Sequence, residues 1–272
     1  MKQYLKVQND RKKYHINPFK NTVHRSSLFA PSMHNADTWI TFVNHFLIKR
    51  NYKSVALKLT AIGNTGNLLD SQTIEISEPK VYAFNLSSVF NKFKAFNYLI
   101  EFYSDKNLFV PFPAVIVSHV GKGFCNIVHA YNRILNDVFE NDNINEESVA
   151  ESSIDVLNNK KFDTFFNLAS GMSEVKGDLD IFYEKDKKKI KKKIKVSIPR
   201  LSFKTFYLSK ILPSSAEGGT VKINQPKPDL FFGRMLAGRL NKKTKAFSSN
   251  HSFYDCSKTK EYFNSKESYR TY

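Results

Sequence analysis

The feature that most constrains the fold is an internal repeat, because residues of the same type recur along the 272-residue chain at a nearly fixed spacing. The spacing is 123 residues for the earliest pairs, 120 residues for a middle group, and 122 residues for the others. The pairs are Thr41/Thr164, Phe42/Phe165, Asn44/Asn167, Leu57/Leu179, Ile74/Ile194, Ser77/Ser197, Pro79/Pro199, Phe84/Phe206, Leu86/Leu208, Ser87/Ser209, Leu108/Leu230, Phe109/Phe231 and His129/His251. The changes in spacing fall in turns, where insertions are tolerated. This ordered self-similarity predicts a tandem duplication.

Each repeat has a hydrophobic pattern with a period of two, which is typical of β-strands. Residues 38–44 alternate around Trp39, the only tryptophan, which we expect in the core. Val55, Leu57 and Leu59 put apolar side chains on one face, and turn residues follow at 63–67. Several such short strands in about a hundred residues are typical of a β-sandwich. The sequence therefore predicts an all-β protein with two tandem, internally repeated antiparallel β-sandwich domains, Ig-like or jelly-roll-like.

The predicted domain boundaries follow changes in composition along the chain. Residues 1–33 are basic and lack a sustained period, so they are expected to form an N-terminal arm. Residues 136–156 carry seven acidic side chains and no glycine or proline, which favours an acidic linker with a short helix. The first sandwich is expected at 34–135 and the second at 157–256. Residues 257–272 are expected to form a C-terminal tail.

A lysine-rich segment at residues 184–198 has two interpretations. Its counterpart in the first repeat is a predicted hairpin, and Ile190, Ile194 and Ile198 share one face with a period of two. The lysines are then expected at the tip and on the solvent face of a hairpin, where they protect a sheet edge from pairing with other chains. The alternative is a surface that binds phosphate groups.

The composition limits the classes of protein to which the chain can belong. No apolar run has the roughly 20 residues of a transmembrane helix, and no signal-peptide pattern opens the chain. Cys125 and Cys256 are not at equivalent repeat positions, which favours free thiols and a cytoplasmic location, although a disulfide stays an alternative. The net charge of +17 is explained by lysine-rich composition or by an anionic partner. The sequence does not define an oligomeric state.

The sequence lacks the motifs of several enzyme classes. It has no Gly-rich phosphate loop, His-Glu-x-x-His, Cys-x-x-Cys or Gly-x-Ser-x-Gly pattern, so no cofactor is predicted. His119 and His129 lie in the last predicted strands of the first repeat, and only His251 repeats. Imidazoles on neighbouring strands can bind a metal. The pattern favours the other interpretation, in which each ring packs and one nitrogen forms a hydrogen bond.

The ends of the last strand in each repeat are candidate ligand-binding positions. An aromatic ring beside amide and charged groups can stack on a sugar and bind its hydroxyl groups. The alternative is an aromatic plug at the end of each core. The candidate residues are His129, Tyr131, Asn132 and Arg133 in the first repeat and His251 and Tyr254 in the second.

Arg234 and Arg239 form a second candidate site. Small residues at 233, 237 and 238 allow close approach of a backbone, so that the two guanidinium groups can bind a carboxylate or a phosphate. The alternative is a bulged strand with both arginines turned outward.

These patterns favour a non-catalytic binding or assembly module that recognises a glycan or another anionic or hydroxyl-rich polymer. Two copies of one site would add avidity toward a repeating polymer. One alternative is a metal- or histidine-dependent enzyme that acts on a carbohydrate. The other is a nucleic-acid-binding protein, for which the lysine-rich hairpin is the argument.

Overall fold

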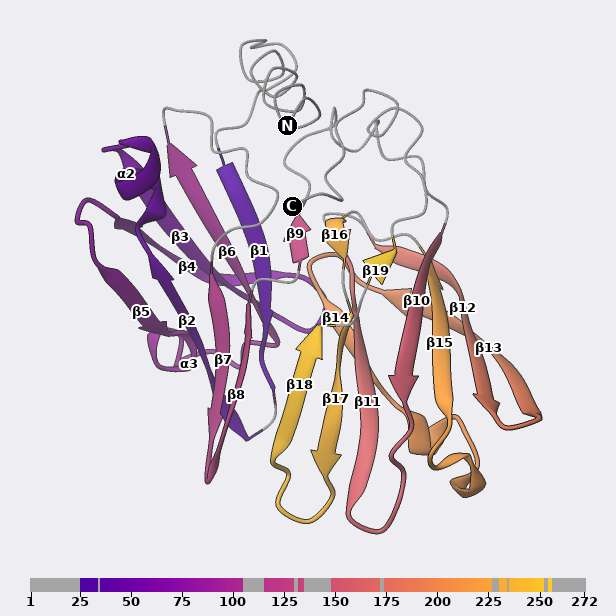
Figure 1. The fold of residues 1–272 in the computed structure, drawn as a ribbon. Coiled ribbons are helices and arrows are strands. Elements are labelled where there is room, and N and C mark those ends of the chain that lie inside the picture. Colours follow the sequence, from indigo (N-terminus) through magenta and orange to yellow (C-terminus); the bar gives the residue numbers. More distant parts are fainter. Residues whose placement is uncertain are drawn as a thin grey trace.

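The computed structural model describes residues 25–33, 35–104, 115–129, 132–134, 148–171, 174–226, 230–233, 235–251 and 254–255. Most of these residues lie in antiparallel strands (Figure 1), which confirms the all-β class. The strands are β1 Arg25–Pro31, β2 Ala36–Val43, β3 Val55–Ile62, β4 Leu68–Glu75, β5 Val81–Asn85, β6 Asn97–Ser104, β7 Ile116–Gly121, β8 Phe124–His129, β9 Asn132–Ile134, β10 Ser148–Asp155, β11 Phe162–Ala169, β12 Val175–Lys185, β13 Lys188–Ile198, β14 Phe203–Tyr207, β15 Thr220–Pro226, β16 Leu230–Gly233, β17 Leu236–Asn241, β18 Phe247–His251 and β19 Tyr254–Asp255. The helices are α2 His45–Arg50 and α3 Leu86–Val89, with the 3-10 turns η1 Leu208–Lys210 and η2 Ser214–Ala216. No helix of the described residues is long and apolar enough to span a membrane.

The strands form two β-sandwiches whose sheets have the same strand order. The first sandwich has the sheets β1-β6-β3-β4 and β5-β2-β7-β8. The second has β10-β15-β12-β13, which β19 extends beside β10, and β14-β11-β17-β18. Each sandwich has its own core, with Ile40, Leu57 and Ile100 in the first and Phe166 and Leu179 in the second. Alternating side chains therefore fill the space between two sheets in both halves.

The register of the two halves also agrees. Leu57 lies opposite Ile74 in the β3–β4 pair, and Leu179 lies opposite Ile194 in the β12–β13 pair. These four residues are two of the pairs that recur in the sequence. The same cross-strand contact thus forms at the same place in each sandwich.

The strand pairing corrects the spacing expected for one strand. Phe84 lies opposite Ile40 in the first sandwich, and Phe206 lies opposite Phe166 in the second. Strands β2 and β11 therefore correspond at 126 residues, the difference between Ile40 and Phe166. The expected spacing of 123 is wrong here because the connections differ in length. Helix α2, for example, lies between β2 and β3 of the first sandwich.

The residue that corresponds to Thr164 is consequently Thr38 rather than Thr41. Both threonines are buried, and each hydroxyl donates a hydrogen bond to the carbonyl of the last residue of the preceding strand. These acceptors are Pro31 and Asp155, each at 3.2 Å. A buried hydroxyl needs such a partner, and the same backbone geometry provides it twice.

Two predicted boundaries are wrong. Arg25–Pro31, expected in the N-terminal arm, forms β1 and contributes Leu28 to the first core. Ser148–Asp155, expected in a linker with a short helix, forms β10 and contributes Ile154 to the second core. Strand β10 is mostly polar and β1 begins with Arg25, Ser26 and Ser27, so pairing with β15 and β6 decides their structure rather than propensity. Residues 1–24 of the expected arm, residues 136–147 of the expected linker and the expected tail at 257–272 lie outside the described residues.

Trp39 occupies the opposite face of β2 from the one expected. Thr38, Ile40 and Phe42 are buried, whereas Trp39 is half-buried on the outer side of the sheet. A period of two identifies two faces but does not say which of them is inside.

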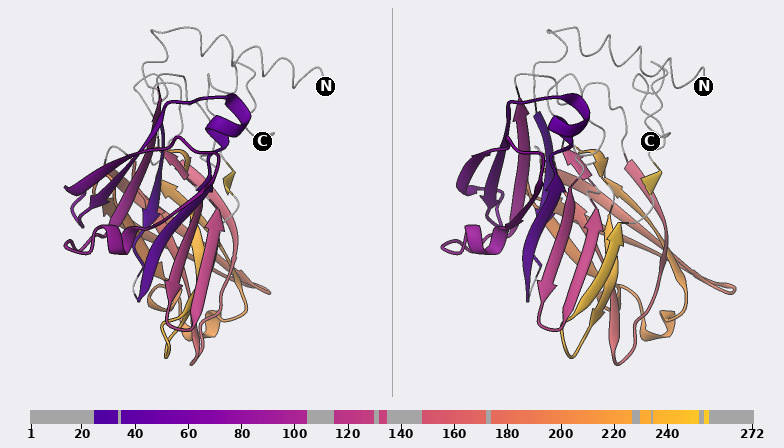
Figure 2. Two further views of the ribbon diagram at one scale, coloured as in Figure 1. Left: turned by 90° about the vertical axis from the view of Figure 1, so that its left-hand side faces the viewer. Right: turned by 60° about the vertical axis from the view of Figure 1, so that its left-hand side comes forward.

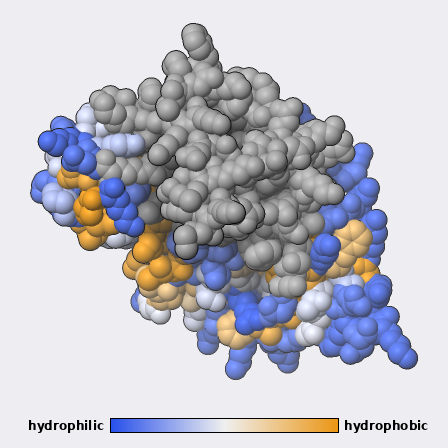
Figure 3. Space-filling view, turned by 45° about the horizontal axis from the view of Figure 1, so that its top comes forward, coloured by the Kyte–Doolittle hydropathy of each residue, from blue (hydrophilic) through white to orange (hydrophobic). Residues whose placement is uncertain are grey.

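The lysine-rich segment is a hairpin, as predicted. Strand β13 is an edge strand that pairs with β12, and its lysines are exposed. Lys193 approaches Asp178 and Lys189 approaches Glu184 across the pair. The surface of the molecule in Figure 3 is hydrophilic at the right-hand end, where this hairpin lies in Figure 1. These charges oppose edge-to-edge pairing with another sheet.

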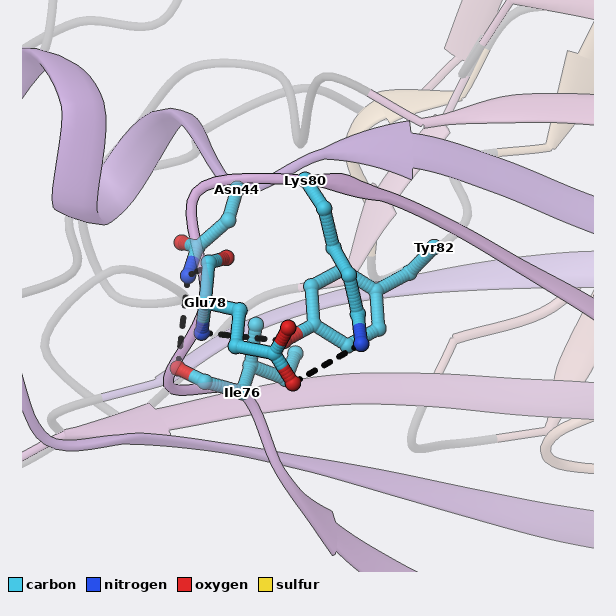
Figure 4. A network of polar contacts seen from close by, with 5 residues as sticks. All are labelled: Asn44, Ile76, Glu78, Lys80 and Tyr82. Carbon is cyan, nitrogen blue, oxygen red and sulfur yellow. Dashed lines mark hydrogen bonds and ion pairs between the residues drawn. The ribbon is translucent and has the colours of Figure 1, made fainter.

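Helix α2 begins at an asparagine that also anchors the next connection of the sandwich. The side-chain oxygen of Asn44 accepts from the N–H of Leu47 at 3.2 Å and so caps the helix. Its amide nitrogen donates to the carbonyls of Ile76 and Glu78 at 3.3 and 3.2 Å (Figure 4). The Glu78 carboxylate binds Lys80 at 2.8 Å in the same network. One buried amide thus joins β2, α2 and the β4–β5 connection.

Candidate functional site

The two sandwiches meet along the edge strands β8 and β18, which run side by side (Figures 1 and 2). The side chain of Asn126 donates to the Ser249 hydroxyl at 2.9 Å and accepts from the Ser249 N–H at 2.6 Å. The ring of Phe247 packs edge-on against Phe124 at a centroid distance of 5.2 Å. Leu236 of β17 is buried within the core of the first sandwich. Side chains therefore join the two sandwiches into a continuous packed structure.

His129 and His251, the repeated histidines, lie together at this seam. Their Nε2 atoms are 2.6 Å apart, and their rings are 4.4 Å apart at an interplanar angle of 75°. In this contact one Nε2 donates the hydrogen and the other accepts it, and the tautomers decide which ring has which role. Equivalent positions of the two repeats thus form one contact.

His119 is the buried histidine of the seam. Its Nε2 lies 2.9 Å from the Pro31 carbonyl and donates to it, and its ring packs on Phe247 at 5.5 Å. Its Nδ1 is buried without a hydrogen-bond partner among the described residues. Burial lowers the pKa of His119 to about 4, although the Pro31 carbonyl acts in the opposite direction. The ring is therefore neutral at pH 7, with its hydrogen on Nε2.

Beside the seam, a cleft of about 640 Å³ opens between the two sandwiches. Its apolar lining includes Phe165, Phe203 and Phe247, all buried in the second sandwich. From the first sandwich, Phe96 stacks on Phe203 with a centroid distance of 5.1 Å and an interplanar angle of 23°. Aromatic rings of both sandwiches thus form one wall. A volume of this size is within the usual range of ligand pockets.

Polar groups border this aromatic wall. They are the side chains of Asn35, Asn64, Asn67 and Lys94 from the first sandwich and Thr205 and Tyr207 from the second. Burial, and then the negative charge of Asp163, raise the pKa of Tyr207 above its ordinary value, so its phenol stays protonated at neutral pH. The border therefore supplies amide, hydroxyl and ammonium donors.

The β3–β4 turn that carries two of these asparagines is held against the second sandwich. Gly66 has a φ of 76°, and a Cβ atom there would lie 2.0 Å from the Arg200 carbonyl oxygen. Only glycine fits this conformation and this approach without a backbone shift. Asn97 also donates to the Leu201 carbonyl at 3.2 Å. The turn and the adjacent start of β6 are thus in contact with residues 200–201 of the second sandwich.

The other predicted site residues are dispersed. Asn132 and Arg133 lie in β9, which pairs with β16 of the second sandwich, and Tyr254 lies in β19, which pairs with β10. Tyr131 and Arg234 lie outside the described residues. Arg239 forms an exposed ion pair with Asp155. Of the predicted site residues whose side chains the structure describes, His129, His251 and Arg239, the two histidines contact each other.

Sequence reasoning missed the residues of the cleft. Residues 63–67 were assigned only to a turn, and Phe96 and Phe203 stand in no motif. The turn signal was correct, but a period of two cannot tell that two segments about a hundred residues apart face each other. Among the described residues, no group of three or more His, Cys, Asp or Glu side chains could hold a metal ion.

Comparisons with known proteins identify no family for this chain. No protein-family model and no curated protein matches the sequence. A calcium-binding mutant of β-glucuronidase 2 from Bacteroides uniformis is 10% identical, with a TM-score of 0.16, over 85% of this chain and 26% of that one. The same enzyme bound to cyclophellitol-6-carboxylate aziridine is 10% identical, with a TM-score of 0.16, over 88% and 28%. The chain spans about a quarter of these enzymes, and a similarity this low supports no functional inference.

Proposed function

We propose that the protein is a non-catalytic binding module that takes a hydroxyl-rich ligand, such as a short segment of a glycan, in the cleft between the sandwiches. The observation that carries this proposal is the aromatic wall of Phe96 and Phe203 beside the amides of Asn64 and Asn67. Aromatic faces pack on the C–H faces of sugars, and amides donate to and accept from sugar hydroxyls.

The chemistry of the lining supports binding rather than hydrolysis. Glycoside hydrolysis uses two carboxyl groups placed on either side of the scissile bond. The described residues that line the cleft include no aspartate, glutamate or histidine. The lining carries one full charge, that of Lys94, which adds attraction for an acidic sugar. A neutral or acidic glycan therefore fits this cleft better than a basic ligand does.

The strand-end residues predicted from the sequence are proposed as a second contact for a longer polymer. Tyr131→Ala and Tyr254→Ala test that part separately. The nucleic-acid alternative has weaker support, since Lys189 and Lys193 of the hairpin approach Glu184 and Asp178. The cytoplasmic location stays a prediction, and the exposed free thiol of Cys125 is in keeping with it.

A matched pair of phenylalanines allows a sharp test. Phe96 lines the cleft and is 36% exposed, whereas Phe93 is 38% exposed and lies outside the lining. A glycan array should identify a ligand, and calorimetry should then show about tenfold weaker binding for Phe96→Ala. Asn64→Ala should weaken it further, and Phe93→Ala should bind like the original chain. Equal binding by the Phe96 and Phe93 variants would contradict the proposal, as would an array without any bound glycan.

A further inference from the structure

The outer face of the β5-β2-β7-β8 sheet is unusual for a protein in which a quarter of the residues are charged. The strand register places one contiguous set of side chains on this face, and Asp37 at one end is its charged member. We call the set the outer face of the first sandwich; it consists of Trp39, Thr41, Val43, Val81, Ala83, Ile116, Ser118, Val120, Cys125 and Ile127, with Asp37, Asn85 and His129 at its margins. Five of these are large exposed aliphatic residues, namely Val43, Val81, Ile116, Val120 and Ile127. A flat apolar patch of this kind usually marks an interaction site.

The second sandwich shows what this face does. Because β2 corresponds to β11 and β7 to β17, the positions of Trp39 and Ile116 correspond to Phe165 and Leu236. These two residues are buried where the first sandwich packs on the second, and Phe247, which corresponds to Cys125, is buried there as well. The same sheet face is thus covered in one half of the chain and exposed in the other.

A second copy cannot cover the exposed face in a head-to-tail manner. In the first sandwich, the covering surface includes Leu99, Ile62 and His119. The corresponding positions in the second sandwich are Lys222, Glu184 and Arg239, which are exposed and charged. Charged side chains opposite an apolar face would lose their hydration without gaining partners.

We propose that two copies of this chain pair through their outer faces around a two-fold axis. This pairing places a mostly apolar sheet face against an identical one, with Asp37 at its margin hydrogen-bonded to Asn85. Two sheets packed face to face also bury alternate side chains, as the sheets within each sandwich do. The proposal does not depend on the cleft, which lies on other residues.

The size of the face predicts a weak, concentration-dependent dimer. Four strands about 4.8 Å apart and five residues long give a footprint of about 20 by 17 Å. This is smaller than the roughly 800 Å² per partner of a standard stable interface. The dimer should therefore dissociate on dilution, and sedimentation velocity over a range of protein concentrations should reveal both species.

Trp39 provides an intrinsic reporter, because it is the only tryptophan and lies within the outer face. Its fluorescence should shift to longer wavelength as the dimer dissociates and the indole is exposed to water. Ile127→Lys should raise the dissociation constant by about 100-fold or more, since the two-fold axis places the unpaired charge in the contact twice. Leu68→Lys is the matched control, because Leu68 is 59% exposed on β4 and Ile127 is 62% exposed on β8.

The outcomes decide the proposal directly. A dimer that Ile127→Lys dissociates and Leu68→Lys preserves, with a matching shift in Trp39 fluorescence, supports it. A purified chain that remains monomeric at every concentration overturns it and assigns the face to a different protein. If the dimer survives both substitutions, or if each substitution dissociates it, the proposal is also overturned.

Discussion

His119 makes a specific contribution to the pH dependence of folding. Burial lowers its pKa to about 4 in the folded protein, whereas an exposed histidine has a pKa of 6.5. Between these values the unfolded chain binds a proton on this ring and the folded protein does not. The stability contributed by the neutral ring is therefore fully present above pH 6.5, and it is lost as the pH falls toward 4.

The size of the effect follows from the two pKa values. Each pKa unit corresponds to about 1.4 kcal/mol, so the loss between pH 6.5 and pH 4 should be about 3 kcal/mol. This is a large part of the 5–15 kcal/mol that stabilises a typical domain. The structural cause is burial of the ring, and an imidazolium there would also need an acceptor at Nδ1, which has none among the described residues.

Urea unfolding of the original chain and of His119→Gln, at a series of pH values, isolates this contribution. Glutamine does not titrate, and its amide can still donate to the Pro31 carbonyl that His119 contacts. Carboxyl groups and the other histidines titrate in both proteins, so they cancel in the difference. The free-energy difference between the two proteins should change by about 3 kcal/mol from pH 7 to pH 4. Two parallel curves would refute the reasoning.

Three further substitutions test the contacts of the seam and of the second sandwich by chemical denaturation. Asn126→Ala removes both hydrogen bonds to Ser249 and should cost about 1–3 kcal/mol; a loss below about 0.5 kcal/mol would show that water replaces them. Arg239→Ala breaks only an exposed ion pair with Asp155 and should cost less than about 1 kcal/mol of stability; because salt screens this pair, the cost should be smaller still at high salt. Gly238→Ala places a Cβ atom 2.2 Å from a carbonyl oxygen of β18, so the strands must shift and the cost should be about 1–3 kcal/mol; an unchanged stability would contradict this packing.

The sequence predicted the strands well where turns and alternation agree. The Leu57 strand, the turn at 63–67 and the lysine-rich hairpin are examples, because their period and their turn residues are local properties. The prediction failed for β1 and β10, because pairing with β6 and β15 extends strands over segments that have many polar residues. It also failed for the side of Trp39, because alternation does not identify the inner face.

The candidate site was less predictable than the fold. The equivalence of His129 and His251 was visible in the sequence, but their contact at 2.6 Å required the two edge strands to lie side by side. The aromatic pair of Phe96 and Phe203 comes from different sandwiches, and neither residue belongs to a motif. Contacts between distant segments depend on how domains dock, which local patterns do not describe.

The sequence by itself determined that the chain folds twice into the same kind of β-sandwich, since alternation, turn residues and the repeat spacing are all local signals. Only the tertiary structure decided that corresponding sheet faces have different environments. Phe165 is buried between the sandwiches, whereas Trp39 at the corresponding position lies on an outer face. The physical reason is that burial of a sheet's second face depends on whether another surface of matching shape and polarity packs against it.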